Sequence, residues 1–184
     1  MAFVHHDLEL IHRGARVNLR VDELQKRGGG TQRREVAEVA DAVTILPLLD
    51  DGRVVMIRNR RFAVKETLLE LPAGTIDSGE DPDPAAAREL EEETGYRAAH
   101  LEKVTAFYTS PGFCTEFMHG YVATGLTPTQ QNLDETEEID VEPMPLDDVL
   151  QLARDGDPAL RDGKSLLLLT WYAAFGRHRD DARS

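Results

Sequence analysis

The sequence predicts an α/β domain, in which a mixed β-sheet lies between helices, with a β extension at its N-terminus. The chain has 184 residues, which suits one domain of roughly 100–150 residues and an added segment. Short apolar runs alternate with helical patterns across residues 41–179. That alternation favours helices packed on a sheet, of α/β or α + β type.

The first segment, residues 1–40, shows the pattern of a β-hairpin. Apolar and polar residues alternate from Val17 to Val21, and Gly28–Gly30 predicts the turn before a second strand at Arg33–Val39. Because the segment has few large apolar residues, it cannot form a core alone. We expect it to pack on the main domain or on a second subunit, and we expect residues 180–184 to be a frayed tail.

The main domain, residues 41–179, contains six predicted strands. The first two are apolar runs separated by the turn Asp50–Gly52. The predicted strands are Val43–Leu49, Val54–Arg58, Leu68–Leu71, Ala106–Tyr108, Phe117–Ala123 and Ile139–Val141.

Three helices are predicted in the same domain. One runs over Pro84–Thr94, with Asp83 as its N-cap and Gly95 as its C-terminal stop. A second covers Leu146–Arg154, and the last spans Ser165–Arg177. The last is too short for a membrane span, so we expect a core or subunit-contact helix.

Acidic residues are concentrated in two stretches, 77–93 and 133–148, within a chain of net charge −13. Such density opposes binding to a nucleic-acid backbone and favours divalent metal ions. The single cysteine, Cys114, excludes an intramolecular disulfide and a cysteine-cluster metal site. No apolar run approaches 18 residues and the N-terminus has no leader pattern, which predicts a soluble cytoplasmic protein without a membrane partner.

Three glutamates of the first predicted helix share one face. Glu89, Glu92 and Glu93 stand at positions i, i+3 and i+4, and like charges at this spacing cost a few tenths of a kcal/mol per pair. A hard cation offsets that cost, because Mg²⁺ prefers oxygen ligands. Arg88, one turn before Glu92, can hold that carboxylate in place.

The glutamates belong to a longer pattern of fixed spacing. Gly74 is followed by five residues and Glu80, then by seven residues and the run Arg88–Tyr96, RELEEETGY. This stretch resembles the Nudix box, with Tyr96 where an aliphatic residue is commoner. Gly74 and Gly79 allow the loop before the helix to bend around an ion, and Gly74, Glu80, Arg88 and Gly95 are the structural positions of the box.

The resemblance implies the α/β/α sandwich of Nudix hydrolases, which cleave a nucleoside diphosphate linked to another moiety. It also implies two or three Mg²⁺ or Mn²⁺ ions per site. By resemblance, Glu89 and Glu93 are direct ligands, and Glu92 is a ligand or acts through water. The carbonyl of Ala73 completes the set, and Glu137 adds a further ligand.

Outside the box, most of residues 33–170 resemble the ADP-ribose pyrophosphatase branch. That similarity implies a homodimer, with residues 1–40 at its interface, that hydrolyses ADP-ribose to AMP and ribose 5-phosphate. The segments that carry it are Arg33–Val36, Arg58–Arg61, Leu69–Gly74, Ser110–Glu116 and Asp134–Ile139.

The branch resemblance also assigns substrate contacts. Arg61 matches a phosphate-binding arginine, and Arg34 matches one that reaches the pyrophosphate from the partner subunit. Glu116 and Gly112 match substrate-side positions. An arginine binds phosphate through two parallel hydrogen bonds, which a lysine cannot do.

The acidic run Leu133–Glu138 matches a mobile loop that carries the general base. The resemblance assigns the base to Glu135, and a register slip of one to three residues would assign it to Asp134, Glu137 or Glu138. A carboxylate on such a loop can approach the metals when substrate binds.

Two other functions remain open at this stage. One is hydrolysis of a nucleotide sugar such as GDP-mannose, on a similar scaffold. The other is a Nudix-like module that senses ADP-ribose without cleaving it, which the complete set of box glutamates disfavours. Phe62 and Phe113 are the candidates for stacking on the base.

Overall fold

The computed structural model describes residues 5–176 of the chain, with side chains from Glu9 onwards. The predicted tail at 180–184 and the last predicted helical residue, Arg177, lie outside the described residues. The chain forms two compact units. The first comprises Met1–Asp41 and Phe107–Phe117, and the second comprises Ala42–Ala106 and Met118–Ser184.

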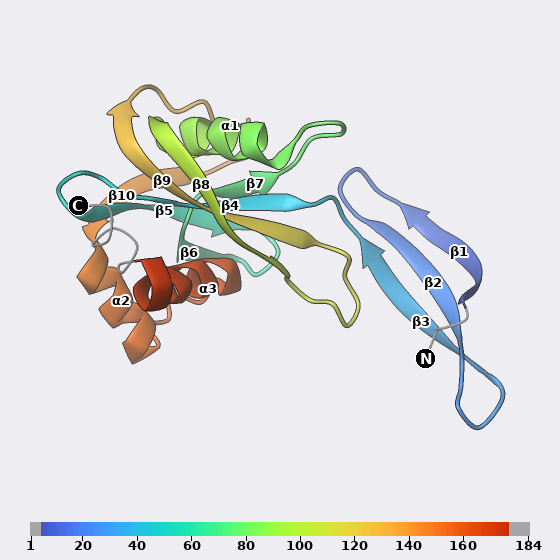
Figure 1. The fold of residues 1–184 in the computed structure, drawn as a ribbon. Coiled ribbons are helices and arrows are strands. Elements are labelled where there is room, and N and C mark those ends of the chain that lie inside the picture. Colours follow the sequence, from blue (N-terminus) through green and yellow to red (C-terminus); the bar gives the residue numbers. More distant parts are fainter. Residues whose placement is uncertain (1–4, 177–184) are drawn as a thin grey trace. The chain divides into compact units, whose positions relative to one another are not determined.

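The first unit is built on a three-stranded antiparallel sheet (Figure 1). Its strands, in the order β1–β2–β3, are β1 (His5–Arg13), β2 (Asn18–Gln25) and β3 (Thr31–Glu38). The hairpin of β2 and β3 agrees with the sequence prediction, whereas β1 was not predicted.

A loop distant in sequence belongs to the same unit. The amide of Ala37 in β3 donates to the carbonyl of Phe113 at 2.7 Å, and the amide of Thr115 donates to the carbonyl of Ala37 at 3.0 Å. The unit predicted from residues 1–40 therefore also includes Phe107–Phe117. Among its described apolar residues only Val21 is buried.

The second unit contains two sheets, with strand orders β7–β4–β9–β8 and β10–β5–β6. The first sheet is mixed, because β4 pairs parallel with β9 and antiparallel with β7. The strands are β4 (Ala42–Pro47), β5 (Arg53–Arg61), β6 (Glu66–Glu70), β7 (Ala73–Thr75), β8 (Tyr96–Tyr108), β9 (Phe117–Pro128) and β10 (Ile139–Pro145).

Helices cover both faces of the sheet that contains β4 (Figure 1). On one face, Val43 and Ile45 of β4 pack with Leu90 of α1 (Pro82–Thr94). On the other face, Leu46 packs in a second core with side chains of α2 (Leu146–Asp155) and α3 (Gly163–Trp171). This arrangement confirms the predicted α/β/α sandwich.

The predicted N-cap of α1, Asp83, is wrong, because the helix begins two residues earlier. The helix begins at Pro82 with Asp81 as N-cap, and the amide of Ala85 donates to the Asp81 carbonyl at 3.2 Å. The two consecutive Asp-Pro pairs at 81–84 both fit a helix start, because proline suits the first helical position. Asp83 instead accepts a hydrogen bond from the Tyr121 hydroxyl at 2.6 Å.

The last predicted helix is not α-helical over its whole predicted length. The α-helix α3 ends at Trp171, and the chain continues in the π-helical turn η1 (Tyr172–Gly176). Within residues 5–176, no helix has both the length and the apolarity needed to cross a membrane.

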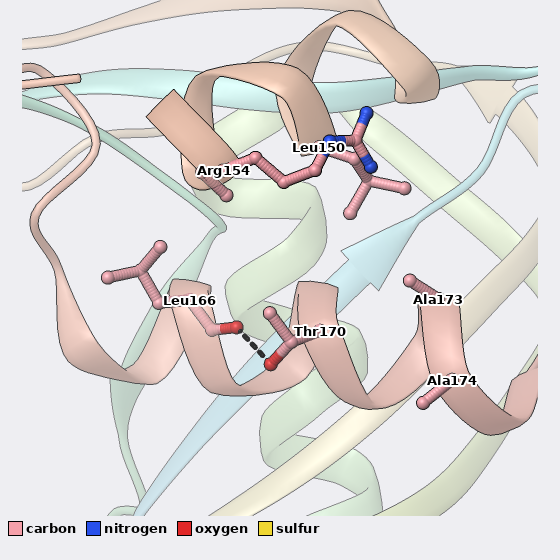
Figure 2. A pocket seen from close by; sticks show the side chains of 7 residues that line it. Leu150, Arg154, Leu166, Thr170, Ala173 and Ala174 are labelled. Atoms are coloured by element: carbon pink, nitrogen blue, oxygen red, sulfur yellow. Dashed lines mark hydrogen bonds between the residues drawn. The ribbon is translucent and has the colours of Figure 1, made fainter. Parts of the chain in front are cut away.

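A groove lies between α2, α3 and η1 (Figure 2). Its lining is apolar except for Arg154 and Thr170, and the Thr170 hydroxyl donates to the Leu166 carbonyl at 2.7 Å. The groove is lined by Leu150, Ala153, Arg154, Leu166, Thr170, Ala173 and Ala174. None of the box carboxylates lines this groove.

Candidate active site

Gly74 brings the backbone of β7 against a box glutamate of α1. A Cβ atom at Gly74 would lie 2.0 Å from Cδ of Glu89. This glycine was expected in a flexible loop, but it lies in strand β7, where the absence of a side chain lets the Glu89 carboxylate approach the backbone. Gly79, with a φ of 84°, is the glycine that turns the loop.

Gly74→Ala is expected to push the Glu89 carboxylate aside. Because that carboxylate is the end of a flexible side chain, it can move, and the free energy of unfolding should fall by less than about 1 kcal/mol. The affinity for the metal ion should fall roughly tenfold, because a ligand is displaced. A Mn²⁺ titration and thermal unfolding measure the two effects. Gly163→Ala is the matched control, because a Cβ there meets nothing within 4 Å. Unchanged Mn²⁺ affinity in Gly74→Ala would contradict the close approach as a requirement.

Arg88 binds three of the box carboxylates at once. Its Nε and Nη2 atoms donate to Glu80 at 3.1 and 2.9 Å, and Nη1 donates to Glu89 at 2.7 Å and to Glu92 at 3.0 Å. Nη2 also reaches the carbonyl of Thr75 at 3.2 Å. Hydrogen bonding to Glu80 raises the pKa of Arg88. The structural positions Glu80 and Arg88 therefore fasten the loop and β7 to the helix.

Glu93 is a buried carboxyl group, with 3% of the residue exposed. Its Oε2 accepts a hydrogen bond from the amide of Ala73 at 2.8 Å. Burial raises the pKa of Glu93 to about 8, and the charges of Glu89 and Glu137 act in the same direction. Arg61 opposes the shift. Burial also raises the pKa of Glu89.

The donor set suits a hard cation. Within residues 5–176, no three His, Cys, Asp or Glu side chains are arranged as a ready metal-ligand set, and Glu89 and Glu92 are paired with Arg88. The groups present are nevertheless carboxylate oxygens, with the Ala73 backbone beside the buried Glu93. Divalent charge would favour the ionised form of Glu93, which burial alone disfavours.

The raised pKa of Glu93 predicts a pH-dependent stability of the metal-free protein. The folded state holds this proton up to about pH 8, whereas the unfolded chain releases it near pH 4.5. The free energy of unfolding should therefore fall as pH rises through this window, by up to about 4 kcal/mol. Urea unfolding at pH 5 and pH 9, with EDTA, measures it. Glu93→Gln should lose most of this slope, and an equal slope in both proteins would contradict the assignment.

The loop after β9 is anchored on the C-terminal end of α1, where the helix stops at Gly95. The side-chain amide of Gln131 donates to the carbonyl of Glu93 at 2.7 Å, and the amide of Asn132 donates to the carbonyl of Glu92 at 2.9 Å. Gln131 was not predicted as a site residue, because nothing in its local sequence pattern marks it as an anchor.

The same loop brings one candidate acidic residue to the box. Glu137 accepts a hydrogen bond from the amide of Asp134 at 2.9 Å, and its charge acts on both Glu89 and Glu93. Glu135 is exposed on this loop. The structure thus brings Glu137 to the carboxylate cluster and leaves Glu135 facing solvent.

Arg61, at the end of β5, lies within electrostatic reach of Glu93. Its Nε and Nη2 atoms donate to the two carboxylate oxygens of Glu70 at 2.8 and 2.6 Å. Glu70 is fully buried. Glu70 lies in the segment Leu69–Gly74, one of those that carry the branch resemblance, but no role was predicted for it.

The other predicted substrate residues, Arg34, Gly112 and Glu116, lie in the first unit. Arg34 is exposed on β3, in register with Asp22 of β2. Gly112 and Glu116 lie in the loop that is hydrogen-bonded to β3. The carbonyl of Glu116 accepts a hydrogen bond from the amide of Thr109 at 3.2 Å. Phe113 of that loop is 61% exposed.

Comparison with known proteins agrees with this geometry. A model of the NUDIX domain matches residues 39–164. The ADP-ribose pyrophosphatase of Bacillus subtilis is 40% identical over 146 residues, covering 78% of this chain and 79% of that protein. The methanol dehydrogenase activator of Bacillus methanolicus is 36% identical over 165 residues, covering 89% and 88%. The GDP-mannose pyrophosphatase of Citrobacter koseri is 33% identical over 165 residues, covering 84% and 85%.

A solved structure shares the fold. The crystal structure of an ADP compounds hydrolase matches with a TM-score of 0.81 and 25% sequence identity, over 96% of this chain and 97% of that one. Nudix hydrolases generally use divalent metal ions such as Mg²⁺, and the box carboxylates lie together beside β7. The family model covers more than half of the chain, so the protein belongs to the Nudix family and is a Nudix hydrolase.

Proposed function

We propose that this Nudix hydrolase is a Mg²⁺-dependent ADP-ribose pyrophosphatase, which splits ADP-ribose into AMP and ribose 5-phosphate. The observation that carries the proposal is the buried Glu93, with Glu89, Glu137 and the cationic Arg61 close enough to shift its pKa. Anionic metal ligands and a phosphate-binding cation thereby meet at one place. The 40% identical ADP-ribose pyrophosphatase of Bacillus subtilis supports the choice of substrate.

Four groups would hold two or three Mg²⁺ or Mn²⁺ ions: the carboxylates of Glu89, Glu93 and Glu137 and the carbonyl of Ala73. Glu92 would act as a further ligand or through water. Bound ions would supply positive charge to the pyrophosphate oxygens and lower the pKa of water. The support for this set is its all-oxygen chemistry and the mutual electrostatic effects of the three glutamates.

Protein side chains would supply the remaining steps. Arg61 would bind a phosphate through the edge of its guanidinium that does not face Glu70. Glu135, exposed on the loop anchored by Gln131, would accept the proton of the attacking water. Gly112 and Glu116 would contact the substrate from the loop of the first unit.

We further propose that the active form is a homodimer, with Arg34 of the partner subunit reaching the pyrophosphate. The domain division proposed with it places residues 1–40 at the interface and residues 41–179 in the hydrolase domain. The composition of the first unit supports this, because Val21 is its buried apolar residue among those described, whereas Leu10, Ile11 and Val17 are 44–54% exposed. Apolar surface of this kind is stabilised when a second chain covers it.

A product assay tests the proposed substrate. The protein is incubated with Mg²⁺ and either ADP-ribose or GDP-mannose, and the products are separated and identified. We expect AMP and ribose 5-phosphate from ADP-ribose at a higher kcat/KM. Faster release of GMP and mannose 1-phosphate would favour the alternative that the 33% identical GDP-mannose pyrophosphatase represents. Binding of ADP-ribose without any product would favour a sensing module.

A further inference from the structure

A second cation shares the buried carboxylate that holds Arg61. Nζ of Lys164 lies 2.5 Å from Oε2 of Glu70, the oxygen that Nη2 of Arg61 contacts at 2.6 Å. The Lys164 side chain is 11% exposed and that of Glu70 is 1% exposed. A buried carboxylate is stable only with charged or hydrogen-bonded partners, and Glu70 has two cations.

The first turn of α3 fixes the position of Lys164. Asp162, the N-cap, accepts hydrogen bonds from the amide and hydroxyl of Ser165 at 3.0 and 2.5 Å, and it lies 2.9 Å from Nζ of Lys164. The buried Ser165 hydroxyl in turn accepts from the amide of Leu71 at 2.8 Å. The helix start is therefore fastened to the residue that directly follows Glu70.

The geometry of the pair leaves Arg61 partly available. Arg61 donates to Glu70 through its Nε and Nη2 edge, so the Nη1 edge of the planar guanidinium can still donate to two oxygens of an anion. The Arg61 side chain is 38% exposed, unlike Glu70 and Lys164. The outward part of this network is therefore a guanidinium held in one orientation.

We propose that Lys164 is a positioning residue for phosphate binding, and that it acts through Glu70 on Arg61. By offsetting the charge of Glu70, Lys164 preserves positive potential at the free edge of Arg61 and holds the guanidinium within electrostatic reach of Glu93. The inference rests on the proposed function, in which Arg61 binds the pyrophosphate.

A double-mutant cycle tests the inference. Lys164→Met, Arg61→Ala and the double variant are compared for KM and kcat on ADP-ribose, and for the Kd of its non-hydrolysable α,β-methylene analogue. We expect Lys164→Met to raise KM and Kd about tenfold with kcat changed less than about threefold. In the Arg61→Ala background, Lys164→Met should have no further effect. Lys103→Met, an exposed lysine of β8, is the matched control and should behave as wild type.

The cycle separates a positioning role from a structural one. A lower melting temperature of Lys164→Met with unchanged KM and Kd would overturn the inference. It would also be overturned if the Kd of the double variant were raised by the product of the two single-variant factors. If Lys164→Met does not fold, Glu70→Gln is compared with Glu70→Gln/Lys164→Met, which removes the buried anion and cation together. Because Lys164 acts through Glu70, the loss of Lys164 should not raise the Kd beyond that of Glu70→Gln, and a further severalfold rise would overturn the inference.

Failure of the proposed function gives a different result. A wild-type protein that leaves ADP-ribose intact contradicts the proposed function, whatever the variants do. The Kd values of the analogue still decide whether Lys164 acts through Arg61, because they need no turnover. Rescue of the Lys164 site by Lys164→Arg, which keeps the charge, would further support positioning.

Discussion

Glu93→Gln is expected to lower the kcat for ADP-ribose by about three orders of magnitude while the fold persists. Glu93 is the buried carboxyl group beside the Ala73 amide, and an amide in its place binds a divalent cation far less well than a carboxylate. Gln has nearly the same volume, and burial already favours an uncharged group at this position. Steady-state kinetics with saturating Mg²⁺ measure the loss, and circular dichroism measures the fold.

Glu91→Gln is the matched control for this variant. Glu91 lies on the same helix, but its carboxylate pairs with Arg97 at 3.0 and 2.8 Å. Its kcat should stay within about twofold of wild type, because exposed ion pairs contribute little. Similar losses in both variants would indicate damage to the helix, and wild-type turnover in Glu93→Gln would remove Glu93 from the mechanism.

Glu135→Gln is expected to lower kcat by about 10²–10⁴-fold with metal affinity unchanged. Glu135 is exposed on the loop that Gln131 and Asn132 anchor to α1, so its loss should not disturb the carboxylate cluster. A kcat comparison and a Mn²⁺ titration on the same preparation measure the two quantities.

Neighbouring variants resolve the register of this loop. Glu137→Gln should weaken Mn²⁺ binding, because Glu137 is within electrostatic reach of Glu89 and Glu93. Glu138→Gln is the control for Mn²⁺ affinity alone, because Glu138 is not among the groups that act on Glu89 and Glu93. If Glu138→Gln or Asp134→Asn loses turnover while Glu135→Gln keeps it, the base belongs to that residue.

The fold could be predicted where the sequence carries a local signal. The apolar run near Val43 predicted β4, and the Asp-Pro start and the Gly95 stop predicted α1. Strand β8 has no buried residue and therefore no run of core side chains, so only its last residues were predicted. Strand β7 has three small residues and no pattern of its own, because its pairing with β4 defines it.

The site residues could be predicted where they lie close together in the sequence. Box positions such as Glu89 and Arg88 follow from spacing along one helix, and their contacts agree with that spacing. Glu70 and Lys164 are 94 residues apart in sequence, so no local pattern joins them. The loop Phe107–Phe117 was likewise not assigned to the first unit, because Phe113 and Thr115 bond to Ala37 of β3, which is distant from them in sequence.

The most direct test of the account is anomalous diffraction from crystals soaked in Mn²⁺ together with the non-hydrolysable ADP-ribose analogue. Manganese peaks are expected between the carboxylates of Glu89 and Glu93 and the Ala73 carbonyl, with the analogue's pyrophosphate against them, and they should vanish in Glu93→Gln. Crystals that bind the analogue but show no manganese among these groups would contradict the claim that the acidic cluster is a metal site for pyrophosphate hydrolysis.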